Sequence, residues 1–452
     1  MSRAISTLDW RGSDAEPVGD LVIRGARVLD PGSGLDAVRD VVVRDGVVAQ
    51  LGEPGSGNVE DAEVVEGDGL TVLPAFFDPH VHLRTPGQEN EEDLETGTRA
   101  AAAGGYCGIV AMANTAPPVD TAADVSALRE RAREQATVPT GFVGTVTKGM
   151  QGIELSEMSD LASAGAVGFS DDGLPIANAR VMRRALQYQR LVGLPIALHE
   201  QDPDLSAGGS MHEGEVSALL GIGGWPSVAE STMIARDIAL AMFEEARIHI
   251  QHLSAFESVA AVEHAKAYGV EVTCEATPHH LTLTDDEVRS LDSRFKMNPP
   301  LRTEADRQSL IDAVRSGTID CIATDHAPHS RDEKEVPFEE AAFGVTGLET
   351  AFPVLYTELV LPGVLDLETI VERLGGGAEA FGFERPRIEI GSEANLTLVD
   401  LEAEWEAGAE GWESRSDNSC FTGRRLQSRV LMTVVAGRVA YRQRSFALGV
   451  AA

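Results

Sequence analysis

Apolar runs of strand length alternate with helix-like segments through the middle of this chain. Eight such runs can be placed: LTVLPAFF, GIVAMAN, GFVGTV, AVGFSD, PIALHE, RIHIQHLS, VEVTCEA and IDCIATD. The stretches between them, such as ENEEDLETGTRAAAAGG and NARVMRRALQYQRLVG, have the periodicity and composition of helices. Eight repeats over residues 74–382 predict an α/β fold with a (β/α)8 TIM-type barrel. An open, doubly wound sheet is the alternative, but no phosphate-binding glycine fingerprint follows the first strand.

The two ends of the chain carry a different pattern. Short alternating strands broken by Gly and Asp (LVIRGARVLD, DVVVRDGVVAQLG) precede the barrel, and the same texture returns after it in ANLTLVDL and VLMTVVAGRVAYR. Residues 21–73 and 383–452 are therefore predicted to form one small β-sandwich, with the barrel inserted between its halves. Residues 1–20 are expected to be a disordered leader, and the acidic segment 402–417 an exposed insertion.

Composition and charge narrow the classes of partner. The chain has 452 residues, 43% of them hydrophobic, as in a soluble globular protein. Its formal net charge of −35 repels nucleic-acid phosphates and anionic membranes, so neither is expected as a partner. No apolar run approaches the roughly 18 residues of a membrane span, and the N-terminal sequence lacks the layout of a signal peptide. The expected location is the cytoplasm.

Lysine and cysteine usage adds little to that picture. Only four of the 37 basic residues are lysines, a bias that a GC-rich genome or a salt-adapted host would each produce. The four cysteines have no spacing that suggests pairing. No disulfide framework is predicted, in keeping with a reducing compartment.

The first candidate chemistry is a pair of histidines at the end of the first apolar run. His80 and His82 are separated by one residue, and Arg84 continues the alternation. In an extended strand, side chains at i and i+2 point to the same face, so two imidazoles could hold one metal ion. An isolated pair of this kind is weak support, because most such pairs bind no metal.

Polar side chains at the ends of other predicted strands strengthen the metal hypothesis. They are Asn114 (second strand), Asp171 and Asp172 (fourth), His199 (fifth), His252 (sixth) and Asp325 (eighth). The carboxyl ends of barrel strands meet on one face, so these side chains should converge there. Four histidines and two carboxylates suit a pair of divalent ions, with zinc favoured. Two such ions can share a hydroxide and polarise a carbonyl, which predicts hydrolysis, or its reverse, at an amide-like carbon.

Motifs spread along the chain resemble those of the dihydroorotase family. They are DPHVHLRTPGQ, AMANT, GFSDDG, ALHEQD, QHLS, EATPHHL, KMNPPLR, ATDHAPH and FGVTGLET. The resemblance is to the long, bacterial-type class I of that family, in the amidohydrolase superfamily. It runs from about residue 21 to residue 442, with the motifs in family order.

The resemblance implies a reaction and a set of site residues. The reaction is the zinc-dependent, reversible cyclisation of N-carbamoyl-L-aspartate to L-dihydroorotate in pyrimidine biosynthesis, in which a metal-bridging hydroxide attacks the ring amide carbonyl in the hydrolytic direction. Two Zn²⁺ ions per chain are implied. By this resemblance His80 and His82 hold the first ion, His199 and His252 hold the second, Asp172 bridges them, and Asp325 is both a ligand of the first ion and the general acid/base. Arg84, Asn114 and His329 would bind the substrate carboxylate, and Asn298, Phe343 and Gly344 the pyrimidine ring.

Further expectations concern neighbouring residues and assembly. His279 and His280 are expected to orient ligands or cap a strand, and His326 to lie behind the ligands. Asp171 should point away from the metals, because it alternates with Asp172. The family resemblance also suggests a homodimer and allows a complex with aspartate transcarbamoylase.

Two other functions remain to be weighed. Hydantoinases and allantoinases are related hydrolases, and hydantoinases carry a lysine on the fourth strand, where this chain reads AVGFSDDG. A non-catalytic subunit that scaffolds aspartate transcarbamoylase would have lost metal ligands, whereas all six positions are filled here. Both alternatives are therefore disfavoured.

Overall fold

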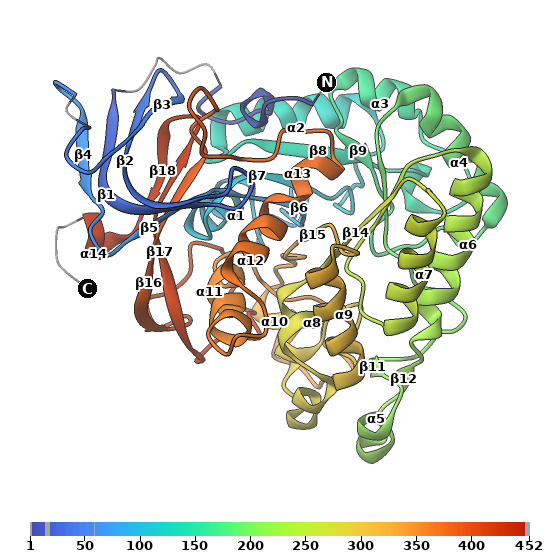
Figure 1. The fold of residues 1–452 in the computed structure, drawn as a ribbon. Helices are drawn as coiled ribbons and strands as arrows, with labels where there is room; N and C mark the ends of the chain where they lie inside the picture. The colour runs from blue at the N-terminus through green and yellow to red at the C-terminus, as the bar shows by residue number, and fades with distance from the viewer. Residues whose placement is uncertain (1, 14–18, 58, 448–452) are drawn as a thin grey trace.

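The computed structural model describes residues 2–13, 19–57 and 59–447 and consists of a barrel with a smaller sheet at its side (Figure 1). All adjacent barrel strands are parallel and follow sequence order. They are β6 (Phe76–Val81), β7 (Tyr106–Ala111), β8 (Thr140–Gly144), β9 (Gly168–Phe169), β10 (Ile196–Leu198), β13 (Ile248–Ile250), β14 (Val272–Ala276) and β15 (Cys321–Ile322).

The barrel closes between its first and last strands. Val81 at the end of β6 forms a parallel bridge with His326, and the His82 amide donates to the His326 carbonyl at 2.8 Å. This closure confirms the predicted (β/α)8 barrel over an open sheet. It also brings the carboxyl ends of the first and eighth strands side by side, where the two-histidine motif and Asp325 lie.

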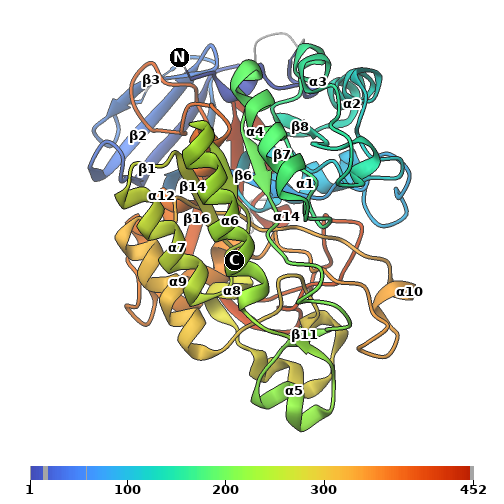
Figure 2. The ribbon, with the colours of Figure 1, turned by 90° about the vertical axis from the view of Figure 1, so that its right-hand side faces the viewer.

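Helices surround the barrel, and local sequence explains where several begin and end (Figure 2). The principal ones are α1 (Leu94–Ala103), α2 (Ala122–Gln135), α3 (Met158–Ala164), α4 (Ala179–Val192), α6 (Val228–Glu244), α7 (Phe256–Ala267), α9 (Glu304–Ser316) and α12 (Leu367–Gly375). Thr121 with Asp124 and Thr303 with Asp306 form capping boxes that satisfy the first amides of α2 and α9. Gly317 ends α9 in the left-handed conformation, at φ 85°.

Shorter elements fill the connections. They are η1 (Ile5–Thr7), η2 (Lys148–Met150), β11 (Met211–His212), α5 (Glu215–Leu220), β12 (Gly224–Trp225), α8 (Pro278–Thr282), η3 (Asp285–Ser290), η4 (Ser293–Phe295), α10 (Arg331–Lys334), α11 (Ala351–Leu355), η5 (Tyr356–Val360), α13 (Gly377–Ala380) and α14 (Arg444–Ala447). No helix in the described part of the chain is both long enough and apolar enough to span a membrane.

Both ends of the chain contribute to the smaller sheet, as predicted. Its strands are β1 (Leu21–Asp30), β2 (Leu35–Arg44), β3 (Val47–Gly52), β4 (Glu63–Glu66), β5 (Thr71–Pro74), β16 (Leu396–Glu406), β17 (Arg425–Val435) and β18 (Arg438–Arg442). They form one continuous sheet in the order β18-β17-β16-β5-β1-β2-β3, with β4 also paired to β1. In Figure 1 the blue N-terminal strands lie beside the red C-terminal ones. Ile23, Val41, Val72, Leu398 and Met432 belong to a separate core inside this sheet.

The first predicted barrel strand is divided between the two sheets. β5 pairs with β16 in the smaller sheet, and the chain enters the barrel at β6 after Ala75. His80 therefore lies within a barrel strand rather than after it. The change of sheet falls within three residues of the domain boundary predicted between residues 73 and 74.

The prediction of a disordered leader is wrong for residues 2–13. Ile5, Leu8 and Trp10 are 2%, 7% and 4% exposed and belong to the main core. Gly108 in β7 and Gly141 in β8 leave the space that Ile5 and Leu8 fill. The segment is ordered because its apolar side chains pack against the barrel. Residues 1 and 14–18 of the predicted leader lie outside the described residues.

The acidic segment 402–417 is only partly an exposed insertion. Its first residues extend β16 to Glu406, and its last residues return to the barrel, where Ser414 and Ser416 are each 7% exposed. The Ser414 hydroxyl donates to the Glu92 carboxylate, and the Ser416 hydroxyl donates to the Glu91 carbonyl at 2.6 Å. These serines are polar, and their composition alone predicts that they are exposed. They can be buried because they form hydrogen bonds with residues of the barrel.

Candidate active site

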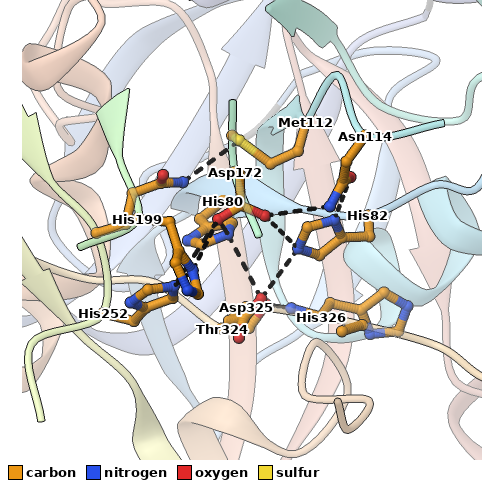
Figure 3. Close-up of polar contacts among 12 residues, drawn as sticks. His80, His82, Met112, Asn114, Asp172, His199, His252, Thr324, Asp325 and His326 are labelled. Carbon is orange, nitrogen blue, oxygen red and sulfur yellow. Dashed lines mark hydrogen bonds and ion pairs between the residues drawn. The ribbon is translucent and has the colours of Figure 1, made fainter. Parts of the chain in front are cut away.

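The six predicted metal ligands converge at the carboxyl end of the barrel (Figure 3). His80 lies in β6, and the other five side chains follow the ends of barrel strands. All six are at most 6% exposed: His80, His82, Asp172, His199, His252 and Asp325. Strand alternation and barrel closure are sufficient to bring these side chains together.

The Asp172 carboxylate lies between two groups of ligand atoms. On one side, His82 Nε2 is 3.4 Å from Asp172 Oδ2 and 3.1 Å from Asp325 Oδ1. On the other, His199 Nδ1 is 3.4 Å and His252 Nε2 3.8 Å from Asp172 Oδ1. His80 Nε2 reaches both groups, at 3.4 Å from Asp325 Oδ1 and 3.6 Å from Asp172 Oδ1. Asp172 therefore occupies the position that a bridging ligand requires.

Buried polar atoms at this centre lack partners, which fits a bound cation. His80 Nε2 and Asp172 Oδ1 are inaccessible to solvent and form no hydrogen bond to any described residue. Buried nitrogen and oxygen atoms of proteins are seldom left unpaired. Imidazole nitrogens and carboxylate oxygens are the donor set that zinc and similar divalent ions prefer.

The electrostatics of the site point to the same conclusion. Burial opposes ionisation of Asp172, but the surrounding histidines outweigh it and hold the pKa of that carboxyl well below its usual range. The pKa of Asp325 is also lowered, since His80 and His82 outweigh its burial. Burial opposes protonation of His80, yet the carboxylates of Glu275, Asp325 and Asp172 raise its pKa well above the ordinary value. The centre thus holds ionised carboxylates and attracts positive charge.

Glu275 at the end of β14 is a functional candidate that sequence reasoning missed. His80 Nδ1 donates to its Oε1 at 2.6 Å, and His249 Nε2 donates to its Oε2 at 3.1 Å. The His252 amide also donates to Glu275 Oε1, at 3.1 Å. A carboxylate on the far nitrogen of a histidine fixes the tautomer and turns the other nitrogen toward the metal. The signal was present in the EATPHHL motif, whose acidic residue ends the seventh strand.

Asn114 lies against the ligand set. His82 Nδ1 donates to Asn114 Oδ1 at 2.9 Å, and Asn114 Nδ2 donates to Asp172 Oδ2 at 3.3 Å. These contacts orient His82 so that its Nε2 faces the two aspartates. The predicted role of Asn114 is substrate binding, and the structure places it in hydrogen bonds to two of the predicted ligands.

Arg84 and His329 lie together beside the metal ligands. Arg84 Nη2 is 3.2 Å from His329 Nε2, and its Nε donates to the Pro328 carbonyl at 3.0 Å. Glu91 Oε2 lies 3.3 Å from Arg84 Nε and 3.3 Å from His329 Nδ1, a link that the sequence did not reveal. Arg84, His252 and Asp325 have positive φ angles of 55°, 31° and 47°. Non-glycine residues rarely adopt this conformation, and it is concentrated at functional sites.

The three residues predicted to contact the ring come together from two loops. Asn298 Nδ2 donates to Gln201 Oε1 at 2.7 Å and lies 3.3 Å from His199 Nε2, while its Oδ1 is buried without a described partner. The Phe343 carbonyl accepts from His329 Nε2 at 2.8 Å. Gly344 has φ 135°, and a Cβ there would lie 3.1 Å from His329 Nε2, so glycine is required.

The remaining polar residues behave as supports. Asp171 accepts the amides of Val146 and Thr147 at 2.8 and 3.1 Å, on the side away from Asp172, as predicted. His326 Nδ1 accepts the Gly347 amide at 3.2 Å, behind the ligands. His280 donates to the Pro299 carbonyl at 3.0 Å.

A closed barrel with this histidine and aspartate centre defines a hydrolase of the amidohydrolase class. The family model described as "Dihydro-orotase-like" matches residues 69–258. A protein named dihydroorotase from Geobacter sp. (strain M21) is 44% identical over 93% of this chain and 99% of its own length. Another of that name, from Pelotomaculum thermopropionicum, is 44% identical over 94% and 99%. The chain belongs to the dihydroorotase family, whose members are cyclic-amide hydrolases.

Solved structures agree on the fold. An L-hydantoinase (dihydropyrimidinase) from Arthrobacter aurescens superposes with a TM-score of 0.83 at 25% identity, covering 93% of this chain and 96% of its own. A dihydropyrimidinase from Brevibacillus agri gives a TM-score of 0.81 at 22% identity, over 94% and 95%. At 22% identity, the likeness to the Brevibacillus agri structure supports the fold alone.

Proposed function

We propose that this protein is an active, zinc-dependent dihydroorotase of pyrimidine biosynthesis, which interconverts N-carbamoyl-L-aspartate and L-dihydroorotate. The observation that carries the proposal is the pairing of Arg84 with His329, with Arg84 close enough to interact electrostatically with Asp325 and Asp172 of the six-ligand centre. An enzyme for this substrate needs an activated water at an amide carbon and a cation for the carboxylate next to the ring. The relatives' names support the same substrate.

Two zinc ions fit the ligand groups described above. His80, His82 and Asp325 would hold one ion, His199 and His252 the other, and Asp172 both. When bound, the ions supply an activated water and polarise the scissile carbonyl.

The protein's own residues supply proton transfer and orientation. The ionised Asp325 can accept a proton and deliver it to the leaving ring nitrogen during hydrolysis, and it does the reverse during cyclisation. Acid/base assistance of this kind contributes about 10²–10⁴-fold to a rate. Arg84 would hold the substrate carboxylate through its fixed charge and forked geometry.

A hydantoinase function is disfavoured by the residues around the bridging position. Asp172 occupies that position, and the segment AVGFSDDG contains no lysine. The lysine nearest to this segment in the sequence is Lys148. Its side chain is 45% exposed and is paired with Glu154 at 2.6 Å. A neutral hydantoin ring also carries no negative charge with which the buried Arg84 could pair. A non-catalytic scaffold is disfavoured because all six ligands are present and convergent.

Assay of the zinc-loaded protein with dihydroorotate and with hydantoin tests the proposal. Dihydroorotate should be the better substrate, and N-carbamoyl-aspartate should be cyclised in the reverse direction. Asp325→Ala should lower kcat by about 10²-fold or more. Preference for hydantoin would overturn the substrate, and an active Asp325→Ala variant would remove its role. One zinc per chain in a fully active sample would contradict the pair.

Assembly is a separate proposal that rests on family resemblance. We propose a homodimer that can associate with aspartate transcarbamoylase. Sedimentation of the protein alone and with that enzyme is the test. A monomer that does not bind the enzyme would reject both the dimer and the complex.

A further inference from the structure

Two of the four lysines are buried beside the residues predicted to contact the substrate ring. Lys296 is 2% exposed and Lys334 is 5% exposed. Lysine is scarce in this chain, since 33 of its 37 basic residues are arginines. Burying a long, charged side chain costs free energy unless every N–H is paired, so these two positions need a physical reason.

The Lys334 ammonium is fully occupied by backbone carbonyls. Its Nζ donates to the carbonyls of Ala342 and Gly344 at 2.9 Å each, and to that of Lys296 at 3.2 Å. An ammonium group has three N–H donors, and all three are used. Among the described residues no carboxylate forms an ion pair with it.

The three carbonyls belong to two separate segments that carry the predicted ring contacts. Lys296 stands two residues before Asn298, and residues 342 and 344 flank Phe343. Further bonds reinforce the junction: the Gly344 amide donates to the Lys296 carbonyl at 3.0 Å, and Lys296 Nζ lies 4.4 Å from the Phe343 ring. Lys334 lies at the centre of this junction.

We propose that Lys334 is a positioning residue for substrate binding, because its ammonium joins the segment that carries Asn298 to the segment that carries Phe343 and Gly344. This junction, here called the lysine clamp, consists of Lys334 and the carbonyls of residues 296, 342 and 344. It sets the separation of the two loops that would enclose the ring. The identity of the ring rests on the proposed function, but the clamp itself does not.

Arginine cannot replace lysine in this geometry. Three acceptors surround one point, and a tetrahedral ammonium on a flexible stem can address all of them. A planar guanidinium spreads its five donors over a fork and needs more space. The use of lysine in an arginine-rich chain is therefore explained by the shape of the acceptor set.

The clamp should weaken as pH rises. Burial, aided by the charge of Lys296, lowers the pKa of Lys334 to about 7, although Cys420, Asp292 and Glu333 act in the opposite direction. Arg294, His329, Arg331, Glu335 and Asp417 also line the cavity beside Lys334. Above this pKa the neutral amine has two N–H donors for three carbonyls. One carbonyl then loses its hydrogen bond to Lys334 Nζ, and the loops separate more easily.

Lys334→Met and Lys334→Arg test the clamp, with Lys148→Met as the matched surface control. In Lys334→Met the KM for dihydroorotate should rise about tenfold, equivalent to roughly 1.4 kcal/mol, with kcat changed less than about twofold. The zinc content of Lys334→Met should equal that of the wild type. Lys334→Arg should also have a raised KM, and Lys148→Met should have the KM of the wild type. An unchanged KM in Lys334→Met, or loss of zinc, would overturn the proposal.

A second measurement separates the clamp from the proposed function. Hydrogen exchange of the amides in residues 335–344 should be faster in Lys334→Met, with β6 and β10 unaffected, whatever substrate the enzyme uses. Equal exchange would reject the clamp. If Lys334→Met does not fold, the wild type provides the test. Its KM should rise between about pH 6 and about pH 8, as Lys334 changes from an ammonium to a neutral amine. A KM that is flat over that range would reject the clamp as well.

Discussion

At the scale of single residues, the type and position of a side chain predicted which residues converge at the candidate metal centre, but not the residues that hold them in place. His80, Asp172 and Asp325 could be found because several histidines and aspartates follow predicted barrel strands, whose carboxyl ends meet on one face. Glu275 and Glu91 escaped notice because a carboxylate that bonds a ligand's far nitrogen has no sequence signature of its own. Only the fold shows that Glu275 Oε1 lies 2.6 Å from His80 Nδ1.

Glu275→Gln should weaken metal binding. The substitution keeps the size of the side chain but removes the charge that raises the basicity of His80 and fixes its tautomer. Zinc affinity should fall by about 10–100-fold, measured by competition with a chelator. Glu154→Gln, at an exposed glutamate, is the control. Equal affinity in Glu275→Gln and the wild type would show that the contact is not needed.

Arg84→Lys should impair substrate binding and leave the metals in place. Lysine keeps the charge but loses the forked donors, so KM for dihydroorotate should rise about tenfold or more. Zinc content should be unchanged. Arg131→Lys, at a half-exposed arginine paired with Glu89, provides the comparison. Zinc loss in Arg84→Lys would mean that the arginine supports the metal centre instead.

At the scale of elements, periodicity predicted the strands and helices but not every boundary between sheets. The run LTVLPAFF is apolar except for Thr71, because both β5 and β6 are buried, so no polar residue marks the point where the chain changes sheet. Ile5, Leu8 and Trp10 were missed for a related reason. Three apolar residues among polar ones have neither helical nor strand periodicity, and only the glycines of β7 and β8 show where they pack.

Ile5→Ala should therefore destabilise the fold without touching the site. Truncating a buried isoleucine costs about 2 kcal/mol or more in free energy of unfolding. Ile5 packs against Gly108 near the start of β7, away from the metal ligands, so KM and zinc content should not change. Leu191→Ala, at a side chain 84% exposed, should change stability by less than about 0.5 kcal/mol. Urea unfolding of both variants makes the comparison, and equal free energies of unfolding would mean that the Ile5 side chain does not stabilise the fold.

At the scale of the whole molecule, sequence predicted how the two domains are assembled but not how closely they cooperate. The N- and C-terminal segments share one sheet, as their common texture indicated. The stretch after β16 also reaches across to the barrel, where Asn418 Nδ2 donates to the Gly344 carbonyl at 3.1 Å and its Oδ1 accepts the His329 amide at 3.2 Å. Composition could not reveal this link, because a buried asparagine and an exposed one look the same in a sequence.

The net charge of the whole protein should make its thermal stability depend on salt concentration. A charge of −35 produces repulsion that opposes the compact state, and isolated surface ion pairs contribute only about 0–1 kcal/mol each. The screening length falls from about 30 Å at 0.01 M to about 10 Å at 0.1 M ionic strength, so added salt should weaken the repulsion more than the short-range pairs. The Tm of the zinc-loaded protein should therefore rise over this range. NaCl and KCl should act equally, because screening depends on ionic strength rather than on the cation. A Tm that falls with salt would mean that ion pairs, not net repulsion, dominate the electrostatics of the fold.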